Sequence, residues 1–247
     1  MPVFTRGAVE IHYEEFGKGF PVLLFAPGGL RSSIPWWHAN PDGPPRPWMD
    51  PTIVLAKNYR VIAMDQRNAG QSRAPITASD GWNSYADDHI ALLDHLGCPR
   101  AHLMGGCIGS SFALTLCKRV PQRIASAVLQ NPIGFDNNRH VFGETFKGWG
   151  AAMRERDPGL TQETLDAFFN NMFGGDFAFS VTREDVKSCT VPLLDMPGDD
   201  PPHPKVVGEE IGALAPRVEI LRAWKGPEHL GIAINVVTAF LQRHTPR

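Results

Sequence analysis

The run Gly105-Gly106-Cys107-Ile108-Gly109 constrains the fold of this chain more than any other stretch. A mostly apolar run of strand length precedes it, and a helical pattern follows it from Ser110 to Pro121. Glycines two before and two after a central residue are needed where a strand turns into a helix so sharply that larger side chains would collide. The pattern therefore predicts a strand, a strained turn and a helix, with the Cys107 side chain projecting from the turn.

A cysteine at such a turn is a candidate nucleophile. The backbone N–H of Ile108 opens the helix, so we expect it to donate to an oxyanion, and the helix dipole favours a thiolate at Cys107. The alternative is a buried structural cysteine, which is common because free cysteine packs like a small hydrophobic residue. The choice between the two depends on which partners the rest of the chain supplies.

The 247 residues fit one large α/β domain, or a core domain with an insertion. The net charge of -2 and the lack of a Lys/Arg run argue against nucleic acid or an anionic membrane as partner. The four cysteines have no zinc-like spacing, so we expect no metal and no cofactor, and a small-molecule substrate as partner. The start of the chain lacks the pattern of a signal peptide, and a reducing cytoplasm is the simplest compartment. The oligomeric state is not predicted.

Residues 21–26 form a continuous apolar run, which is typical of a central strand buried on both faces, and residues 9–16 alternate as an edge strand does. A glycine-rich turn, Pro27-Gly28-Gly29-Leu30, follows the apolar run. We expect Gly29, or Leu30 if the turn is shifted by one, to supply the second oxyanion N–H. An ordinary strand-to-helix turn is an equally good interpretation.

Residues 31–51 form an irregular loop that is rich in tryptophan and proline. Stiff aromatic loops beside a site commonly form pocket walls, so we expect Trp36 and Trp37 to contact the substrate. For these two residues, and for Trp48, anchoring of the loop to the core is an equally good interpretation.

The stretch Asp65-Gln-Arg67-Asn-Ala-Gly70-Gln-Ser72 follows a further buried strand and reads D-x-R-x-x-G-x-S. Together with the G-x-C-x-G turn, it resembles the α/β-hydrolase fold of the capped type. The resemblance spans residues 22–241. It implies an α/β fold with a mostly parallel central sheet flanked by helices, in which residues 1–132 and 189–247 are the core and residues 133–188 a small helical cap. In that family the loop of Asp65 and Arg67 is largely structural.

The resemblance also implies a catalytic triad in the order nucleophile, acid, histidine. Family members carry the acid after the strand expected at residues 189–196, in motifs such as G-x-D-x-x-H-P. Matching that motif puts the acid at Asp200, with Asp199 as the alternative. His203 lies three residues beyond Asp200, and we expect it on the rim of the site.

His229 has the place and order of the family's catalytic histidine. It follows the last expected strand in a glycine-containing loop, before a closing helix expected over residues 232–241. Leu230, next to it, is a candidate substrate contact.

These residues predict a cysteine-dependent hydrolase. Cys107 would attack an acyl carbon, His229 would hold the thiol proton, and Asp200 would orient the imidazole. Esters, lactones and thioesters fit better than peptides, because an amine leaves poorly and the intermediate would collapse back by losing the thiolate. Dienelactone hydrolases look similar at G-x-C-x-G but lack the D-x-R-x-x-G-x-S stretch and the cap. Acyl transfer through the same thioester, and a non-catalytic module that binds a small ligand, remain alternatives.

Overall fold

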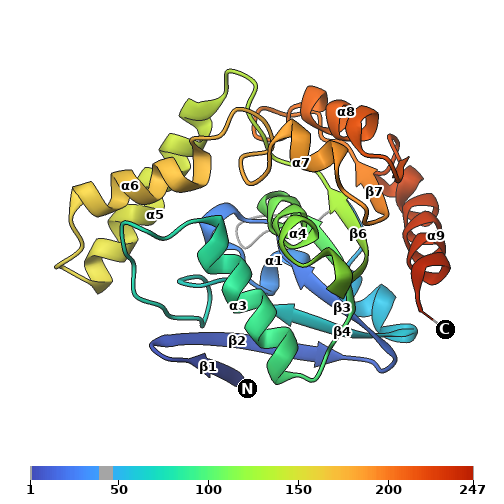
Figure 1. Ribbon diagram of the computed structural model, residues 1–247, viewed down its shortest axis with the longest axis horizontal. Coiled ribbons are helices and arrows are strands. Elements are labelled where there is room, and N and C mark those ends of the chain that lie inside the picture. The colour runs from blue at the N-terminus through green and yellow to red at the C-terminus, as the bar shows by residue number, and fades with distance from the viewer. Residues whose placement is uncertain (1, 39–46, 247) are drawn as a thin grey trace.

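Eight strands form one sheet in the computed structural model, which describes residues 2–38 and 47–246 (Figure 1). Their order across the sheet is β1-β2-β4-β3-β5-β6-β7-β8. From β4 to β8 the neighbouring strands are parallel, whereas β2 is antiparallel to β1 and to β4. The predicted α/β-hydrolase fold with a mostly parallel sheet is therefore confirmed. The strands are β1 (Val3–Arg6), β2 (Val9–Phe16), β3 (Phe20–Phe25), β4 (Tyr59–Met64), β5 (Ala101–Gly106), β6 (Ile124–Gln130), β7 (Leu193–Met196) and β8 (Val218–Ile220).

The prediction that residues 9–16 form an edge strand is wrong. They form β2, but β1 pairs along its outer side, with Val3 opposite His12 and Arg6 opposite Val9. The short β1 therefore occupies the edge and covers the longer strand.

Helices cover both faces of the sheet. In the central strands successive side chains enter opposite cores: Leu23 packs on the face of α3, α4 and α8, and Leu24 on the face of α9. Strands buried on both faces read as continuous apolar runs, which is why β3 was recognisable. The described helices are α1 (Pro35–His38), α2 (Pro51–Val54), α3 (Trp82–His95), α4 (Ile108–Arg119), α5 (Arg139–Arg156), α6 (Gln162–Phe173), α7 (Arg183–Lys187), α8 (Lys205–Leu214) and α9 (Pro227–His244), with short 3-10 turns η1 (Gly29–Arg31), η2 (Leu55–Lys57) and η3 (Pro121–Arg123). None of them is both long and apolar enough to cross a membrane.

The segment between β6 and β7 carries α5, α6 and α7. Figure 1 shows α5 and α6 together at one end of the molecule, on the opposite side from α9. The Thr161 hydroxyl caps the start of α6, since it accepts a hydrogen bond from the backbone N–H of Thr164 at 3.1 Å. The division of residues 133–188 from the core as a cap domain stays a prediction.

The Asp65 loop is held by hydrogen bonds to the backbone. The Asp65 carboxylate accepts from the N–H groups of Ile34 and Gln71, both at 2.8 Å. It therefore ties the tryptophan loop to the turn after β4, which fits the structural role expected of it.

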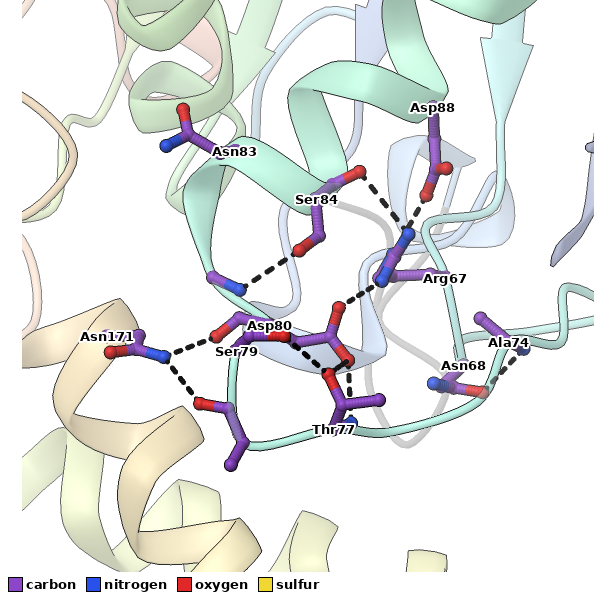
Figure 2. A network of polar contacts seen from close by, with 12 residues as sticks. Arg67, Asn68, Ala74, Thr77, Ser79, Asp80, Asn83, Ser84, Asp88 and Asn171 are labelled. Atoms are coloured by element: carbon purple, nitrogen blue, oxygen red, sulfur yellow. Dashed lines mark hydrogen bonds and ion pairs between the residues drawn. The ribbon is translucent and has the colours of Figure 1, made fainter.

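Arg67 fastens the same turn to α3 (Figure 2). Its guanidinium pairs with Asp80 at 2.5 Å and with Asp88 at 2.8 Å, and all three side chains are largely buried. The helix begins at Trp82, and the Ser84 hydroxyl accepts a hydrogen bond from the backbone N–H of Gly81 at 3.3 Å.

Candidate active site

Cys107 lies at the turn between β5 and α4 in a strained conformation, with φ 57 and ψ -122. A Cβ atom at Gly105 would lie 2.1 Å from the Gly109 carbonyl oxygen, and one at Gly109 would lie 2.1 Å from the Phe25 carbonyl oxygen. Close backbone contact therefore requires both glycines. The strand, turn and helix occur in the order that the sequence predicts.

Several groups lower the pKa of the partly buried Cys107 thiol. Burial by itself would raise this pKa, but the positive charge and hydrogen bond of His203 outweigh it, and two backbone N–H groups also contact the sulfur. One is that of Ile108, the expected donor. The other is that of Gly28, whose φ of 118 is open only to glycine, and not that of Gly29 or Leu30. Gly29 and Leu30 line the pocket beside the sulfur.

His203 joins Asp200 to Cys107. Its Nδ1 hydrogen-bonds to the Asp200 carboxylate, and its backbone N–H donates to the Asp200 carbonyl at 2.9 Å. Its Nε2 is buried, and the Cys107 sulfur, which interacts with His203 strongly enough to shift its pKa, is the group it faces. Burial would lower the pKa of His203, but the charge of Cys107 and the hydrogen bonds to Asp200 and Cys107 raise it to about 9.

The expectation that His203 lies on the rim is wrong, because its side chain is only 12% exposed. Asp200 and His203 form a β-bridge across the two prolines between them, so one tight turn supplies both carboxylate and imidazole. Burial would raise the pKa of Asp200, but hydrogen bonds from His203 lower it. The neighbouring Asp199 is 71% exposed and pairs with Lys225, so Asp200 is the inward-facing carboxylate of the two.

The structure does not bring His229 to Cys107. Gly226 and Pro227 start α9 five residues before the expected helix, which puts His229 in the first helical turn instead of in a loop. Its ring lies 3.7 Å from the Glu228 carboxylate and lines a different pocket, together with Lys205 and Arg222. Leu230, also in α9, is partly buried and packs on the core of that face. Within the described chain, neither His229 nor Leu230 lines a pocket that contains Cys107. His203 is the histidine of the G-x-D-x-x-H-P motif, so the sequence did contain a signal that could have identified it.

Cys107 opens onto two pockets. The larger has a volume of about 300 Å³ and is mainly apolar, with walls from the core and from α5 and α6. Its described lining is Gly28, Gly29, Leu30, Arg31, Trp36, Cys107, Ile108, Ile133, Val141, Phe142, Thr145, Phe146, Phe173, Pro202 and His203. The smaller pocket has a volume of about 190 Å³ and lies on the side of Gln130 and Trp224.

The tryptophans of the 31–51 loop divide between the two roles considered for them. Trp36 lines both pockets at Cys107, and Trp48 lines the smaller one. Trp37 is 1% exposed, and its ring packs over Gly106 in the core of the α9 face. Trp37 therefore anchors the loop. Part of this loop lies outside the described residues.

No group of three or more His, Cys, Asp or Glu side chains is placed to hold a metal ion within residues 2–38 and 47–246. The described groups that meet at Cys107 are instead an imidazole, a carboxylate and two backbone N–H donors. This is the set that acyl transfer through a covalent intermediate requires.

Comparison with protein families agrees with this arrangement. The model of the alpha/beta hydrolase fold family matches residues 21–210. The chain belongs to this family. Its relatives include a putative carbamate hydrolase of Variovorax paradoxus, which is 33% identical over 121 residues. That match covers 49% of this chain and 42% of the relative, so the chain matches less than half the length of this relative.

Two further similarities cover almost the whole chain. A non-heme chloroperoxidase of Kitasatospora aureofaciens is 29% identical over 95% of this chain and 94% of its own. The solved structure of a meta-cleavage product hydrolase of Pseudomonas fluorescens IP01 has a TM-score of 0.73 at 21% identity, covering 99% of this chain and 98% of its own. The structural similarity concerns the fold. Hydrolase names among the relatives support the enzyme class expected from the sequence.

Proposed function

We propose that this α/β-fold protein is a cysteine-dependent hydrolase of small esters, lactones or thioesters, with Cys107 as nucleophile, His203 as acid and base, and Asp200 as the group that orients His203. The observation that carries the proposal is the imidazole of His203, which lies between the Asp200 carboxylate and the Cys107 sulfur. The proposal keeps the nucleophile and acid expected from the sequence and replaces His229 with His203.

In the first step the thiolate of Cys107 attacks the acyl carbon, and the carbonyl oxygen becomes an oxyanion. The N–H groups of Ile108 and Gly28 contact the sulfur and are the donors that we assign to that oxygen. When the intermediate collapses, the bond to the departing oxygen or sulfur breaks and the proton of the His203 imidazolium moves to that atom. The products are an acyl thioester on Cys107 and a neutral His203.

In the second step water attacks the thioester carbon while neutral His203 takes its proton. Collapse of the second intermediate breaks the carbon–sulfur bond. The carboxylic acid leaves, and the thiolate–imidazolium pair is restored.

Two observations favour ester-type substrates. The nitrogen of an amide leaves far less readily than the Cys107 thiolate, so an amide would revert from the first intermediate, whereas a thiolate, or an alcohol that takes the His203 proton as it departs, can be expelled. The larger pocket is lined mainly by aromatic and aliphatic side chains, which suits an apolar acyl chain. A putative carbamate hydrolase among the relatives is in keeping with carbonyl chemistry of this kind.

The test is single-turnover acylation with a short p-nitrophenyl ester, followed by intact-mass analysis of wild type, Cys107→Ala, His203→Ala and His229→Ala. We expect an acyl adduct on wild type, none on Cys107→Ala, and a rate reduced about 100- to 10,000-fold in His203→Ala, the usual contribution of an acid–base group. His229→Ala is the matched control and should acylate as fast as wild type.

The opposite pattern, with His229→Ala impaired and His203→Ala unaffected, would return the role of base to His229. Equal turnover in all three variants would refute the whole mechanism. Product analysis with and without an added alcohol separates hydrolysis from acyl transfer.

A further inference from the structure

The smaller pocket at Cys107 differs chemically from the apolar one. The two share Gly28, Trp36, Cys107 and His203, so the reacting sulfur and the imidazole border both. The other described residues of the smaller pocket are Pro27, Trp48, Gly106, Gln130, Asn131 and Trp224. A substrate whose acyl carbon lies at Cys107 can therefore extend in two directions, one of which leads to two side-chain amides.

Gln130 is held rigidly at the end of β6. Its backbone carbonyl accepts hydrogen bonds from the Cys107 N–H at 2.9 Å and from the Ser110 hydroxyl at 3.1 Å. Val128, two residues earlier, packs in the core that contains Trp224, and alternation along the strand directs the Gln130 side chain to the same face. Its neighbour in register, Gly106, has no side chain to fill that space.

The Gln130 amide is buried without a protein partner. The residue is 2% exposed, and neither Nε2 nor Oε1 has a hydrogen-bond partner within residues 2–38 and 47–246. Oδ1 of Asn131, the next residue, is equally unpaired there. Buried amides in proteins are almost always hydrogen-bonded, so a rigidly placed, unpaired amide beside a reactive sulfur calls for a partner that enters the pocket.

We propose that the smaller pocket binds the departing part of the substrate and that Gln130 recognises a neutral carboxamide on it. The inference rests on the proposed hydrolase function and names the substrate class more narrowly. Gln130 offers one N–H donor and one carbonyl acceptor, whichever way its amide is turned, and a primary carboxamide presents the complementary pair. A carboxylate presents only acceptors, so Oε1 of Gln130 would face it without a donor.

The side chains that line each pocket indicate which part of the substrate it binds. Aromatic and aliphatic side chains of α5 and α6 wall the larger pocket and suit the acyl chain. The smaller pocket brings the amides of Gln130 and Asn131 next to His203, which gives its proton to the departing atom. The alcohol or thiol part of the substrate therefore takes the polar side.

The experiment compares two butyrate esters of nearly equal shape. One is the ester of glycolamide, and the other is the ester of methallyl alcohol, in which an isopropenyl group replaces the carboxamide. The ratio of their kcat/KM values is measured for wild type, Gln130→Met and the control Gln122→Met, which changes an exposed glutamine outside the site. Comparing ratios between proteins removes the difference in leaving-group reactivity.

We expect the glycolamide-to-methallyl ratio to fall about tenfold or more in Gln130→Met and to stay at the wild-type value in Gln122→Met, because a buried group that has lost its partner discriminates strongly. Gln130→Leu serves as a second variant should Gln130→Met fold poorly, and melting temperatures of all variants are recorded.

A binding measurement separates this inference from the hydrolase proposal. Free glycolamide and methallyl alcohol are titrated at millimolar concentration into wild type and Gln130→Met, with the fluorescence of the pocket tryptophans as readout. Loss of glycolamide binding in Gln130→Met without cleavage of either ester would refute the hydrolase and keep the carboxamide site.

Cleavage of both esters with an unchanged ratio and unchanged glycolamide binding would overturn the inference, since the Gln130 amide would then contact only water. The assignment of direction has its own test in the propyl ester of succinamic acid, where the carboxamide is on the acyl side. Dependence on Gln130 with that ester, and not with the glycolamide ester, would place the acyl group in the smaller pocket and overturn the inference.

Discussion

At the scale of single residues, His203 is the group on which the candidate site depends. Its Nδ1 hydrogen-bonds to Asp200, which lies in the same turn, and its other ring nitrogen, Nε2, faces Cys107. The pKa of Cys107 is lowered and that of His203 is raised to about 9, which favours a thiolate–imidazolium pair at pH values between the two. Below the pKa of Cys107 the thiol is protonated, and above the pKa of His203 the imidazole has no proton to give.

The pH dependence of kcat/KM should follow this pair. We expect activity to rise as pH passes the lowered pKa of Cys107 and to decline as pH passes about 9, where His203 loses its proton. Asp200→Asn removes a hydrogen bond and a charge that raise the pKa of His203, so the alkaline limb should move to lower pH. Asp199→Asn, which changes the adjacent exposed carboxylate, should leave the limb in place. An alkaline limb that responds equally to both variants would contradict the pairing of Asp200 with His203.

At the scale of elements, the turn from β5 to α4 was predictable because its constraint is local. Gly105 and Gly109 are needed by contacts with backbone atoms that any such turn produces, so five residues of sequence were enough. The start of α6 is set by an equally local feature, the side-chain cap of Thr161.

The histidine that we propose as acid and base was not predictable in the same way. His229 had the right order in the chain, but Pro227 extends α9 backwards and turns the expected loop into helix. His203 was within the matched motif, yet only the turn across two prolines reveals that its ring points inward. For a related reason, the backbone N–H that contacts the Cys107 sulfur is that of Gly28, next to the expected Gly29, since consecutive left-handed glycines leave the direction of each N–H open until the turn is seen.

The turn from β5 to α4 leads to a stability prediction that compares Gly109, which lies in this turn, with Gly231 of α9. Gly109→Ala puts a Cβ atom 2.1 Å from the Phe25 carbonyl oxygen and should lower the free energy of unfolding by more than about 2 kcal/mol. Gly231→Ala adds a Cβ in open space at an exposed position of α9 and should raise this free energy by about 0.5–1 kcal/mol through helix propensity. Urea unfolding of both variants measures the difference. Equal effects would mean that the contact of Gly109 with β3 is not as close as described.

At the scale of the whole molecule, the site is assembled from parts far apart in sequence. The turn after β3 supplies Gly28, the β5–α4 turn supplies Cys107, and the turn after β7 supplies His203. These turns follow the carboxyl ends of three parallel strands of the same sheet, which is where α/β sheets place their ligands. The segment with α5 and α6 then closes the larger pocket from outside the sheet.

If the larger pocket holds the acyl group as proposed, the junction of core and α5 should set the length of acyl chain that it accepts. Thr145 of α5 lies across from Gly29, with its methyl group 3.9 Å from where a Gly29 Cβ would be, and both residues line the pocket. Thr145→Phe should fill part of the space of about 300 Å³ and lower kcat/KM for hexanoate esters about tenfold relative to acetate esters. The neighbouring Glu144 is exposed and does not line this pocket among the described residues, so Glu144→Phe should leave the ratio unchanged. Kinetics with a series of p-nitrophenyl esters from acetate to octanoate measures this. If Thr145→Phe lowered all chain lengths equally, the acyl chain would not extend between α5 and the core, and the apolar pocket would have to serve another part of the substrate.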